Sequence, residues 1–167
     1  MVVIIFGVSG AGKTTIGKLL ASELGWTFYE GDDFHPARNI DKMLNGIPLT
    51  DKDRGPWLAS LREVIEKALT VGENAVLACS ALKRKYRDDL RVSGQVRFVF
   101  LHGNRSQIEK QLSQRRGHFM DPNLLDSQFA DLQEPTPDED AVVIELGRGP
   151  NELVDEISRK LGLDGKK

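Results

Sequence analysis

The chain has 167 residues, of which 40% are hydrophobic and 29% charged, so we expect one soluble globular domain with a sizeable core. The formal net charge of −2 argues against a protein that binds nucleic acid or a membrane surface. The single cysteine cannot form an internal disulfide, and the three histidines lack the spacing of zinc ligands. The first apolar run is too short for a signal peptide or a membrane span, so we expect a cytoplasmic protein.

The first predicted element leads directly into a phosphate-binding motif. Residues 2–6 are a continuous apolar run typical of a buried strand, and residues 7–14, GVSGAGKT, fit the pattern G-x-x-x-x-G-K-[ST]. Apolar residues then recur at helical spacing until Gly25, so the loop lies between a strand and a helix N-terminus. This context favours a P-loop over a glycine-rich turn with a chance lysine. We expect Lys13 to reach the β- and γ-phosphates of a nucleotide and Thr14 to hold Mg²⁺.

The second predicted strand, residues 26–30, ends among acids. Glu30 closes the strand, and Asp32 and Asp33 follow it. Because ligands of open α/β sheets bind at the carboxyl ends of the strands, we expect these three carboxylates to lie beside the P-loop. Each acid could instead be a solvated loop carboxylate or a helix cap, and we expect one or two of them to be catalytic.

A short helix and a long connection follow. Apolar spacing predicts a helix over residues 36–46, and residues 47–57 are expected to be mostly loop. Pro56 suits the first turn of the next helix, which ends at Gly72. Arg54 lies among the acids of the loop, so a structural ion pair competes with a role in ligand binding.

A basic segment follows the third predicted strand, residues 75–79. Arg84 and Lys85 each have an acid four residues further on, whereas Lys83 and Arg87 are four apart and alike in charge. Two unneutralised cations just past a strand end indicate an anionic ligand. The alternative is a solvated basic face of a helix.

The rest of the chain is predicted to begin with a strand at 97–102, a helix at 104–115, a short lid at 115–121 and a further helix from 122 onward. An acidic surface loop at 134–140, a strand at 141–146 and a last helix at about 153–161 follow. Arg115 and Arg116 with the following glycine indicate the lid, and a basic helix C-terminus is the alternative.

At this point the chain resembles the gluconate kinases. The matching stretches cover nearly the whole chain: residues 7–14, 30–36 with Asn39, Lys42 and Met43, 46–49, 51–57, 79–83 with Tyr86, Arg87 and Asp88, and 116–120 with 127–129. The resemblance implies one P-loop kinase domain over 1–167 in the α/β class, with a five-stranded parallel sheet of order 2-3-1-4-5. Helices cover both faces in this family, and a short lid closes the site, as in shikimate and nucleoside monophosphate kinases.

The resemblance also implies a reaction, the phosphorylation of D-gluconate by ATP to 6-phosphogluconate. It selects Asp32 over Asp33 as the base, because related kinases place the base two residues past the acid that ends the second strand. Glu30 would then lie just outside the direct ligands of Mg²⁺. Arg116, with Arg115, would close over the transferring phosphoryl group.

The expected site residues fall into four groups. Catalysis is assigned to Lys13, Asp32 and Arg116. ATP would contact Gly7, Ser9, Gly10, Ala11, Gly12, Lys13, Thr14, Thr15, Arg115 and Arg148, the last by stacking on adenine. The sugar acid would contact Asp32, Asp33, His35, Arg54, Lys83, Arg87 and His118, and Mg²⁺ would be served by Thr14 and Glu30.

Two alternatives stay open. One is a kinase for another small hydroxylated acid, similar to shikimate kinase. The other is a nucleotide-dependent switch, although the patterns D-x-x-G and N-K-x-D of GTP switches do not occur in the chain. We expect ATP and gluconate as partners, no nucleic acid and no membrane, and the sequence leaves a homodimer open.

Overall fold

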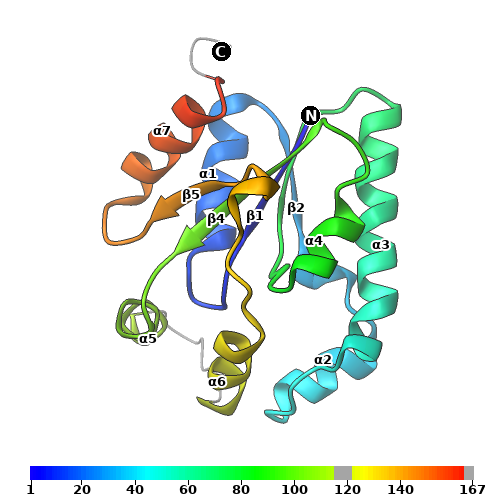
Figure 1. Ribbon diagram of the computed structural model, residues 1–167, viewed down its shortest axis with the longest axis vertical. Helices are drawn as coiled ribbons and strands as arrows, with labels where there is room; N and C mark the ends of the chain where they lie inside the picture. Colours follow the sequence, from blue (N-terminus) through cyan, green and yellow to red (C-terminus); the bar gives the residue numbers. More distant parts are fainter. Residues whose placement is uncertain (115–121, 164–167) are drawn as a thin grey trace.

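A computed structural model describes residues 1–114 and 122–163, and within them five parallel strands form one sheet of order β2-β3-β1-β4-β5. This confirms the predicted class and strand order (Figure 1). The strands are β1 (Val2–Phe6), β2 (Thr27–Glu30), β3 (Ala75–Ala78), β4 (Val96–His102) and β5 (Val142–Glu145). The helices are α1 (Lys13–Leu24), α2 (Ala37–Leu44), α3 (Asp51–Thr70), α4 (Arg84–Leu90), α5 (Arg105–Ser113), α6 (Pro122–Asp131) and α7 (Pro150–Lys160). Two short 3₁₀ helices are η1 (Gly31–Phe34) and η2 (Pro137–Glu139).

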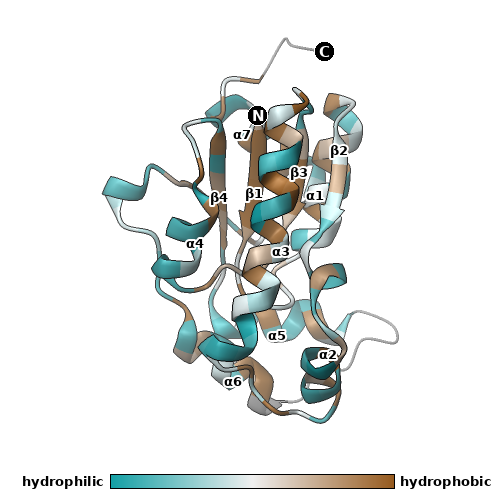
Figure 2. Ribbon diagram, turned by 90° about the vertical axis from the view of Figure 1, so that its right-hand side faces the viewer, coloured by the Kyte–Doolittle hydropathy of each residue, from teal (hydrophilic) through white to brown (hydrophobic). Residues whose placement is uncertain are grey.

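The central strand β1 divides the core into two layers. Because successive side chains of a strand point to opposite faces, Val3 and Ile5 pack toward α1 and α7, whereas Ile4 and Phe6 pack toward α3 and α4. All four side chains are completely buried. Figure 2 shows hydrophobic strands behind α3, whose hydrophilic positions face away from them. The sheet is therefore covered on both faces, as expected for parallel strands.

One helix boundary differs from the prediction. The segment 47–57 is not mostly loop, because α3 begins at Asp51 and contains Pro56. Thr50 caps the helix by accepting a hydrogen bond from the Asp53 backbone N–H at 3.1 Å, and the Asp53 carboxylate accepts from Thr50 N at 2.9 Å. This reciprocal capping box starts the helix early, and Pro56 near its start removes only one backbone donor. As a result, Arg54 is a helical residue.

The acidic segment 134–140 is also more ordered than predicted. Residues 137–139 form η2, and Glu139 is only 4% exposed rather than a solvated surface acid. The predicted lid, residues 115–121, lies outside the described residues, as do Arg115, Arg116 and His118. Among the helices that the structure describes, no span has the length and hydropathy needed to cross a bilayer.

The elements that could bind a ligand gather at one edge of the sheet. In both views α2, α5 and α6 lie beyond the carboxyl ends of the strands, at the bottom of the molecule (Figures 1 and 2). The loop from β1 to α1 and the turn after β2 open toward this edge. Parallel strands bind ligands at this end, so the fold brings the predicted motifs together here.

Candidate active site

The loop between β1 and α1 has the backbone conformation that a P-loop needs. Gly10 and Gly12 have positive φ values of 87° and 96°, a region that other residues rarely adopt. A Cβ atom on Gly10 would also come within 2.6 Å of Leu112 Cγ on α5. Gly12 caps α1, so the first N–H groups of that helix face the loop. Lys13 donates from Nζ to the Val8 carbonyl at 3.0 Å, so its ammonium group lies over the loop. The loop is therefore a built anion site.

The predicted metal residues are neighbours. The Thr14 hydroxyl donates to the Glu30 carboxylate, which joins the start of α1 to the end of β2. A hydroxyl and a carboxylate are oxygen donors of the kind that Mg²⁺ prefers, and Mg²⁺ is usually held by few protein ligands together with substrate phosphates. In the described part of the chain no group of three or more His, Cys, Asp or Glu side chains could hold a metal. The donor set therefore fits an ion that is shared with a bound nucleotide.

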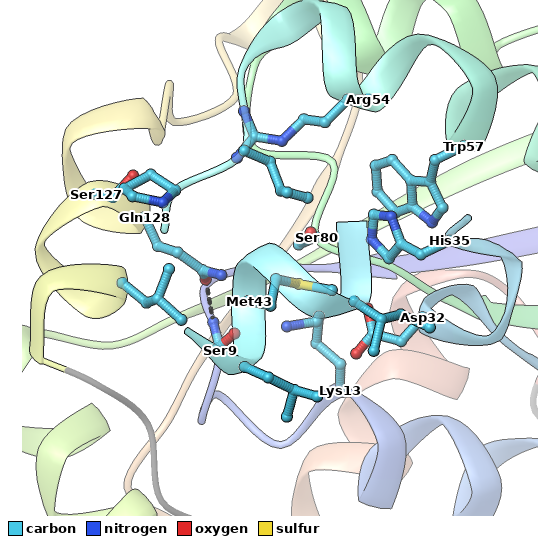
Figure 3. Close-up of a pocket in the computed structure, with 15 residues that line it drawn as sticks. Ser9, Lys13, Asp32, His35, Met43, Arg54, Trp57, Ser80, Ser127 and Gln128 are labelled. Atoms are coloured by element: carbon cyan, nitrogen blue, oxygen red, sulfur yellow. Dashed lines mark hydrogen bonds between the residues drawn. The ribbon is translucent and has the colours of Figure 1, made fainter. Parts of the chain in front are cut away.

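A cavity of about 430 Å³ opens beside the P-loop (Figure 3). This volume suits a small organic ligand. The cavity is lined by residues of the P-loop, η1 and the residue that follows it, α2, the connection to α3, α3 itself, the loop after β3, and α6. They are Ser9, Lys13, Asp32, His35, Ile40, Met43, Leu44, Pro48, Leu49, Arg54, Trp57, Ser80, Leu124, Ser127 and Gln128.

The turn after β2 separates the two candidate bases. Gly31 lets η1 approach β3 closely, because a Cβ atom there would lie 2.6 Å from the Ala78 carbonyl oxygen. Both aspartates are exposed, but Asp32 lines the cavity, whereas Asp33 is not part of the wall. No hydrogen bond or ion pair within the described residues engages the Asp32 carboxylate, so it can accept from a ligand. The geometry therefore favours Asp32 over Asp33.

Arg54 lies in the cavity wall with part of its hydrogen-bonding capacity unused. It is 9% exposed and donates to the Tyr86 hydroxyl at 3.0 Å and to the Asp131 carboxylate at 3.1 Å. These partners come from α4 and α6 rather than from the acids beside it in sequence. A guanidinium has five N–H donors, so three have no partner among the described residues. Arg54 is therefore a cation that a carboxylate in the cavity can reach.

Arg87 is the clearest correction to the sequence prediction. It is completely buried, and its Nε and Nη2 donate to the Glu139 carboxylate at 2.7 and 3.1 Å. Its Nη1 donates to the carbonyls of Ala81 and Leu82, both at 3.0 Å, and Nη2 donates to Gln133 O at 2.8 Å. All five N–H donors are used, so the prediction that Arg87 contacts the sugar acid is wrong.

Lys83 also has a partner, contrary to the prediction. Its ammonium group binds Asp51 at 2.9 Å, and Lys85 and the Tyr86 hydroxyl bind the same carboxylate. Lys85 therefore pairs with Asp51, at the start of α3, instead of with the predicted acid at position 89. Hydrogen bonds from Lys85, Tyr86 and Lys83 hold the pKa of Asp51 well below its usual range. Lys83 is also absent from the cavity wall described above.

His35 is held in the wall by an aromatic neighbour and an amide. Its ring stacks on Trp57 at a centroid distance of 4.6 Å and an angle of 8°, and Asn39 Nδ2 lies 3.1 Å from its Nδ1. Burial lowers the pKa of His35, and the charge of Arg54 adds to this, while Asp32 acts in the opposite direction. The net lowering of the pKa favours the neutral form of the imidazole.

Gln128 was missed at the sequence level. Its Oε1 accepts a hydrogen bond from the Ser9 backbone N–H at 2.6 Å, which ties α6 to the P-loop (Figure 3). Trp57 is a core residue that also lines the cavity, and it is not among the predicted site residues. The motif at residues 127–129 was the available signal for Gln128.

Three further residues lie away from the cavity wall. Cys79 is 1% exposed, and burial raises its pKa to about 12, as expected for a cysteine that packs in the core. Arg148 lies after β5, where it donates to Glu145 O at 3.3 Å and pairs with Glu156. Thr15 is an exposed residue in the first turn of α1. Stacking of Arg148 on adenine stays a prediction.

Comparison with known proteins places the chain among small-molecule kinases. A family model described as an AAA domain matches residues 2–135. The gluconokinase of Gluconobacter oxydans (strain 621H) is 43% identical, over 93% of this chain and 88% of that protein. The crystal structure of a gluconokinase from Sinorhizobium meliloti 1021 has a TM-score of 0.87 and 43% identity, covering 96% of this chain and 90% of the other. An unliganded sugar kinase from Janibacter sp. HTCC2649 has a TM-score of 0.91 and 44% identity, covering 98% and 95%.

Proposed function

The chain belongs to the gluconokinase family of P-loop kinases, and from this premise we propose that it phosphorylates D-gluconate with ATP to give 6-phosphogluconate and ADP. The composition of one cavity supports this reaction. A single cavity is lined by Lys13 of the P-loop, the carboxylate of Asp32 and the guanidinium of Arg54. These groups match the phosphate, the attacking hydroxyl and the carboxylate of the two substrates.

The proposed mechanism assigns one task to each group. The P-loop amides and Lys13 hold the β- and γ-phosphates. Thr14 and Glu30 would hold Mg²⁺, which would neutralise charge on the phosphates. Asp32 accepts the proton of the 6-hydroxyl of gluconate, the oxygen of that hydroxyl bonds to the γ-phosphorus, and the bond from the γ-phosphorus to ADP breaks. Arg54 meets the sugar-acid carboxylate through its remaining donors, because a guanidinium can bind a carboxylate in a bidentate manner.

Several parts of the proposal rest on the sequence alone. Arg115 and Arg116 would close over the phosphoryl group, and His118 would join the substrate pocket. Arg148 would stack on adenine. A single domain over the whole chain, a cytoplasmic location and a homodimer also remain predictions.

The direct test is an assay of ADP release across a panel of sugar acids and polyols. We expect the highest kcat/KM for gluconate, with lower values for other hexonates, shikimate and the neutral hexitol sorbitol. A higher kcat/KM for shikimate, or for another hydroxylated acid, would replace the substrate while keeping the kinase chemistry. ATP turnover that no acid in the panel stimulates would contradict the assignment.

A further inference from the structure

The environment of His35 determines which of its ring nitrogens carries the proton. The ring lies flat on Trp57, as Figure 3 shows, and Trp57 is fixed by a hydrogen bond from its Nε1 to Gly31 O at 2.8 Å. The position of the imidazole plane on the cavity wall is therefore set by packing. The packing leaves open which ring nitrogen of His35 donates a hydrogen bond and which one accepts.

Asn39 determines which ring nitrogen of His35 accepts a hydrogen bond. This residue of α2 is completely buried, and its Nδ2 lies 2.9 Å from the Asp53 carbonyl oxygen and 3.1 Å from His35 Nδ1. A carbonyl oxygen can only accept, so the amide NH₂ of Asn39 must face Asp53. The opposite amide orientation would place Asn39 Oδ1 against that carbonyl. His35 Nδ1 is therefore the acceptor of the second N–H.

A neutral imidazole whose Nδ1 accepts carries its proton on Nε2. No group among the described residues bonds Nε2. In the same part of the chain, Asn39 Oδ1 is the only buried side-chain polar atom without a partner, so Nε2 is accessible. Since His35 is only 9% exposed and lines the cavity, Nε2–H opens toward the ligand space.

We propose that Asn39 is a positioning residue that fixes His35 as a neutral Nε2–H donor, and that this N–H donates to an oxygen of the bound sugar acid. The inference rests on the proposed function for the identity of the ligand. It gives the cavity two complementary neighbours, since Asp32 accepts a hydrogen bond from the ligand whereas His35 donates one. A substrate that lacks the matching oxygen leaves a nearly buried donor unpaired, which lowers its kcat/KM.

The tautomer can be measured without any substrate. In ¹⁵N-labelled wild-type protein near pH 7, we expect the two-bond ¹H–¹⁵N spectrum to show His35 with Nε2 protonated and Nδ1 unprotonated. The chain has three histidines, so the His35→Gln variant assigns the signal. A protonated Nδ1, or an imidazolium ring, overturns the proposal.

Gluconate then tests the donor role. At a gluconate concentration above its KM, with a non-hydrolysable ATP analogue present, we expect the His35 Nε2 resonance to shift while Nδ1 stays an acceptor. A saturated site that leaves the Nε2 resonance unchanged overturns this role. If the wild type does not act on gluconate, the proposed function fails, whereas the tautomer in the free protein is still decided.

Matched variants separate the two ring nitrogens. His35→Gln keeps a donor near the Nε2 position, whereas His35→Asn keeps only a group near the Nδ1 position. We expect His35→Asn to lose roughly 10-fold in kcat/KM for gluconate, and His35→Gln to lose less, with the KM for ATP unchanged in both. Equal losses in the two variants contradict the Nε2 donor.

Asn39→Asp tests the positioning residue itself. A carboxylate at this position can only accept, so a folded Asn39→Asp protein should move the His35 proton to Nδ1 or leave the ring doubly protonated. If the spectrum of folded Asn39→Asp keeps the wild-type tautomer, Asn39 does not set it. The wild-type measurement decides the tautomer even where this variant fails to fold.

Discussion

Two buried arginines on the α3 and α4 side of the sheet differ in their hydrogen bonding. Arg87 is fully enclosed, and all five of its N–H groups meet acceptors, two of them from Glu139. Arg54 is 9% exposed, and its bonds to Tyr86 and Asp131 use two of its donors. The comparison shows that Arg54, unlike Arg87, has donors without a partner among the described residues, and that the local charge pattern in the sequence does not distinguish the two arginines.

The same contrast separates two regions of the molecule. The cavity region contains Lys13, Asp32 and Arg54, whose charges face the ligand space. The second region, which we call the Arg87 corner, comprises Arg87, Glu139 and the carbonyls of Ala81, Leu82 and Gln133. We expect changes in the cavity region to reduce activity at nearly constant stability, and changes in the Arg87 corner to reduce stability at nearly constant activity.

The largest effect is expected for the base. Asp32→Asn removes the acceptor of the hydroxyl proton, so kcat should fall by about 10²–10⁴ with little change in the KM for ATP or in Tm. Asp33→Asn is the matched control, since Asp33 lies outside the cavity wall, and it should keep nearly full activity. If the two phenotypes are exchanged, Asp33 is the base.

The Arg87 corner should respond in the opposite way. Arg87→Met leaves Glu139 as a buried carboxylate without its cation, so the free energy of unfolding should fall by about 3–5 kcal/mol, measured by urea denaturation. At a temperature where the variant is still folded, its kcat/KM for gluconate should stay close to the wild-type value. A large drop in kcat/KM with unchanged stability would return Arg87 to the substrate site.

Lys13→Ala tests the P-loop. The ammonium group is expected to stabilise charge on the transferring phosphoryl group, so its loss should lower kcat by roughly 10²–10³, by analogy with the loss of one preorganised donor. Circular dichroism and Tm should be close to wild type, because Lys13 is only half-buried. A folded Lys13→Ala enzyme with wild-type turnover would refute the kinase mechanism.

Arg54 should control the preference for an acid over a neutral polyol. Loss of a charge-assisted hydrogen bond is expected to cost about 1.5–3 kcal/mol, or roughly 10- to 150-fold in kcat/KM. Arg54→Met should therefore remove the preference for gluconate over sorbitol and spare the KM for ATP. Lys83→Ala is the control, because Lys83 binds Asp51 outside the cavity wall. If the preference survives in Arg54→Met and disappears in Lys83→Ala, the carboxylate site is misplaced.

The smallest effect concerns the pH dependence of stability. Burial raises the pKa of Glu139, but hydrogen bonds from Arg87 and Thr136 outweigh it and leave the pKa below its usual value. A carboxyl group whose pKa is lower in the folded state stabilises the fold at pH values above its pKa in the unfolded state, about 4.3. This stabilisation is lost as the pH falls through the pKa of the folded state. The free energy of unfolding should therefore fall between pH 5 and pH 3, and less steeply in Arg87→Met. Equal slopes in the two proteins would show that this pair does not contribute.

Much of the fold followed from local patterns. The P-loop, the five strands and the helices between them were predictable because apolar periodicity and glycine positions act over a few residues. The resemblance to gluconate kinases supplied the strand order, which the structure confirms. Pro56 indicates a later start for α3 than the structure has, because the capping box formed by Thr50 and Asp53 begins the helix before the proline.

The sequence by itself determined where phosphate binds, because the amides, the lysine and the helix N-terminus of a P-loop come from one continuous segment. Only the tertiary structure decided which cations are available, because their partners are distant in the chain. Arg87 meets Glu139 52 residues away, and Lys83 meets Asp51 32 residues away. The tautomer that we propose for His35 likewise depends on packing. The carbonyl group of Asp53 in α3 orients the side-chain amide of Asn39 in α2, and this amide contacts His35 Nδ1. The partners in these ion pairs and amide hydrogen bonds are brought together only by the fold, so a local charge pattern cannot reveal them.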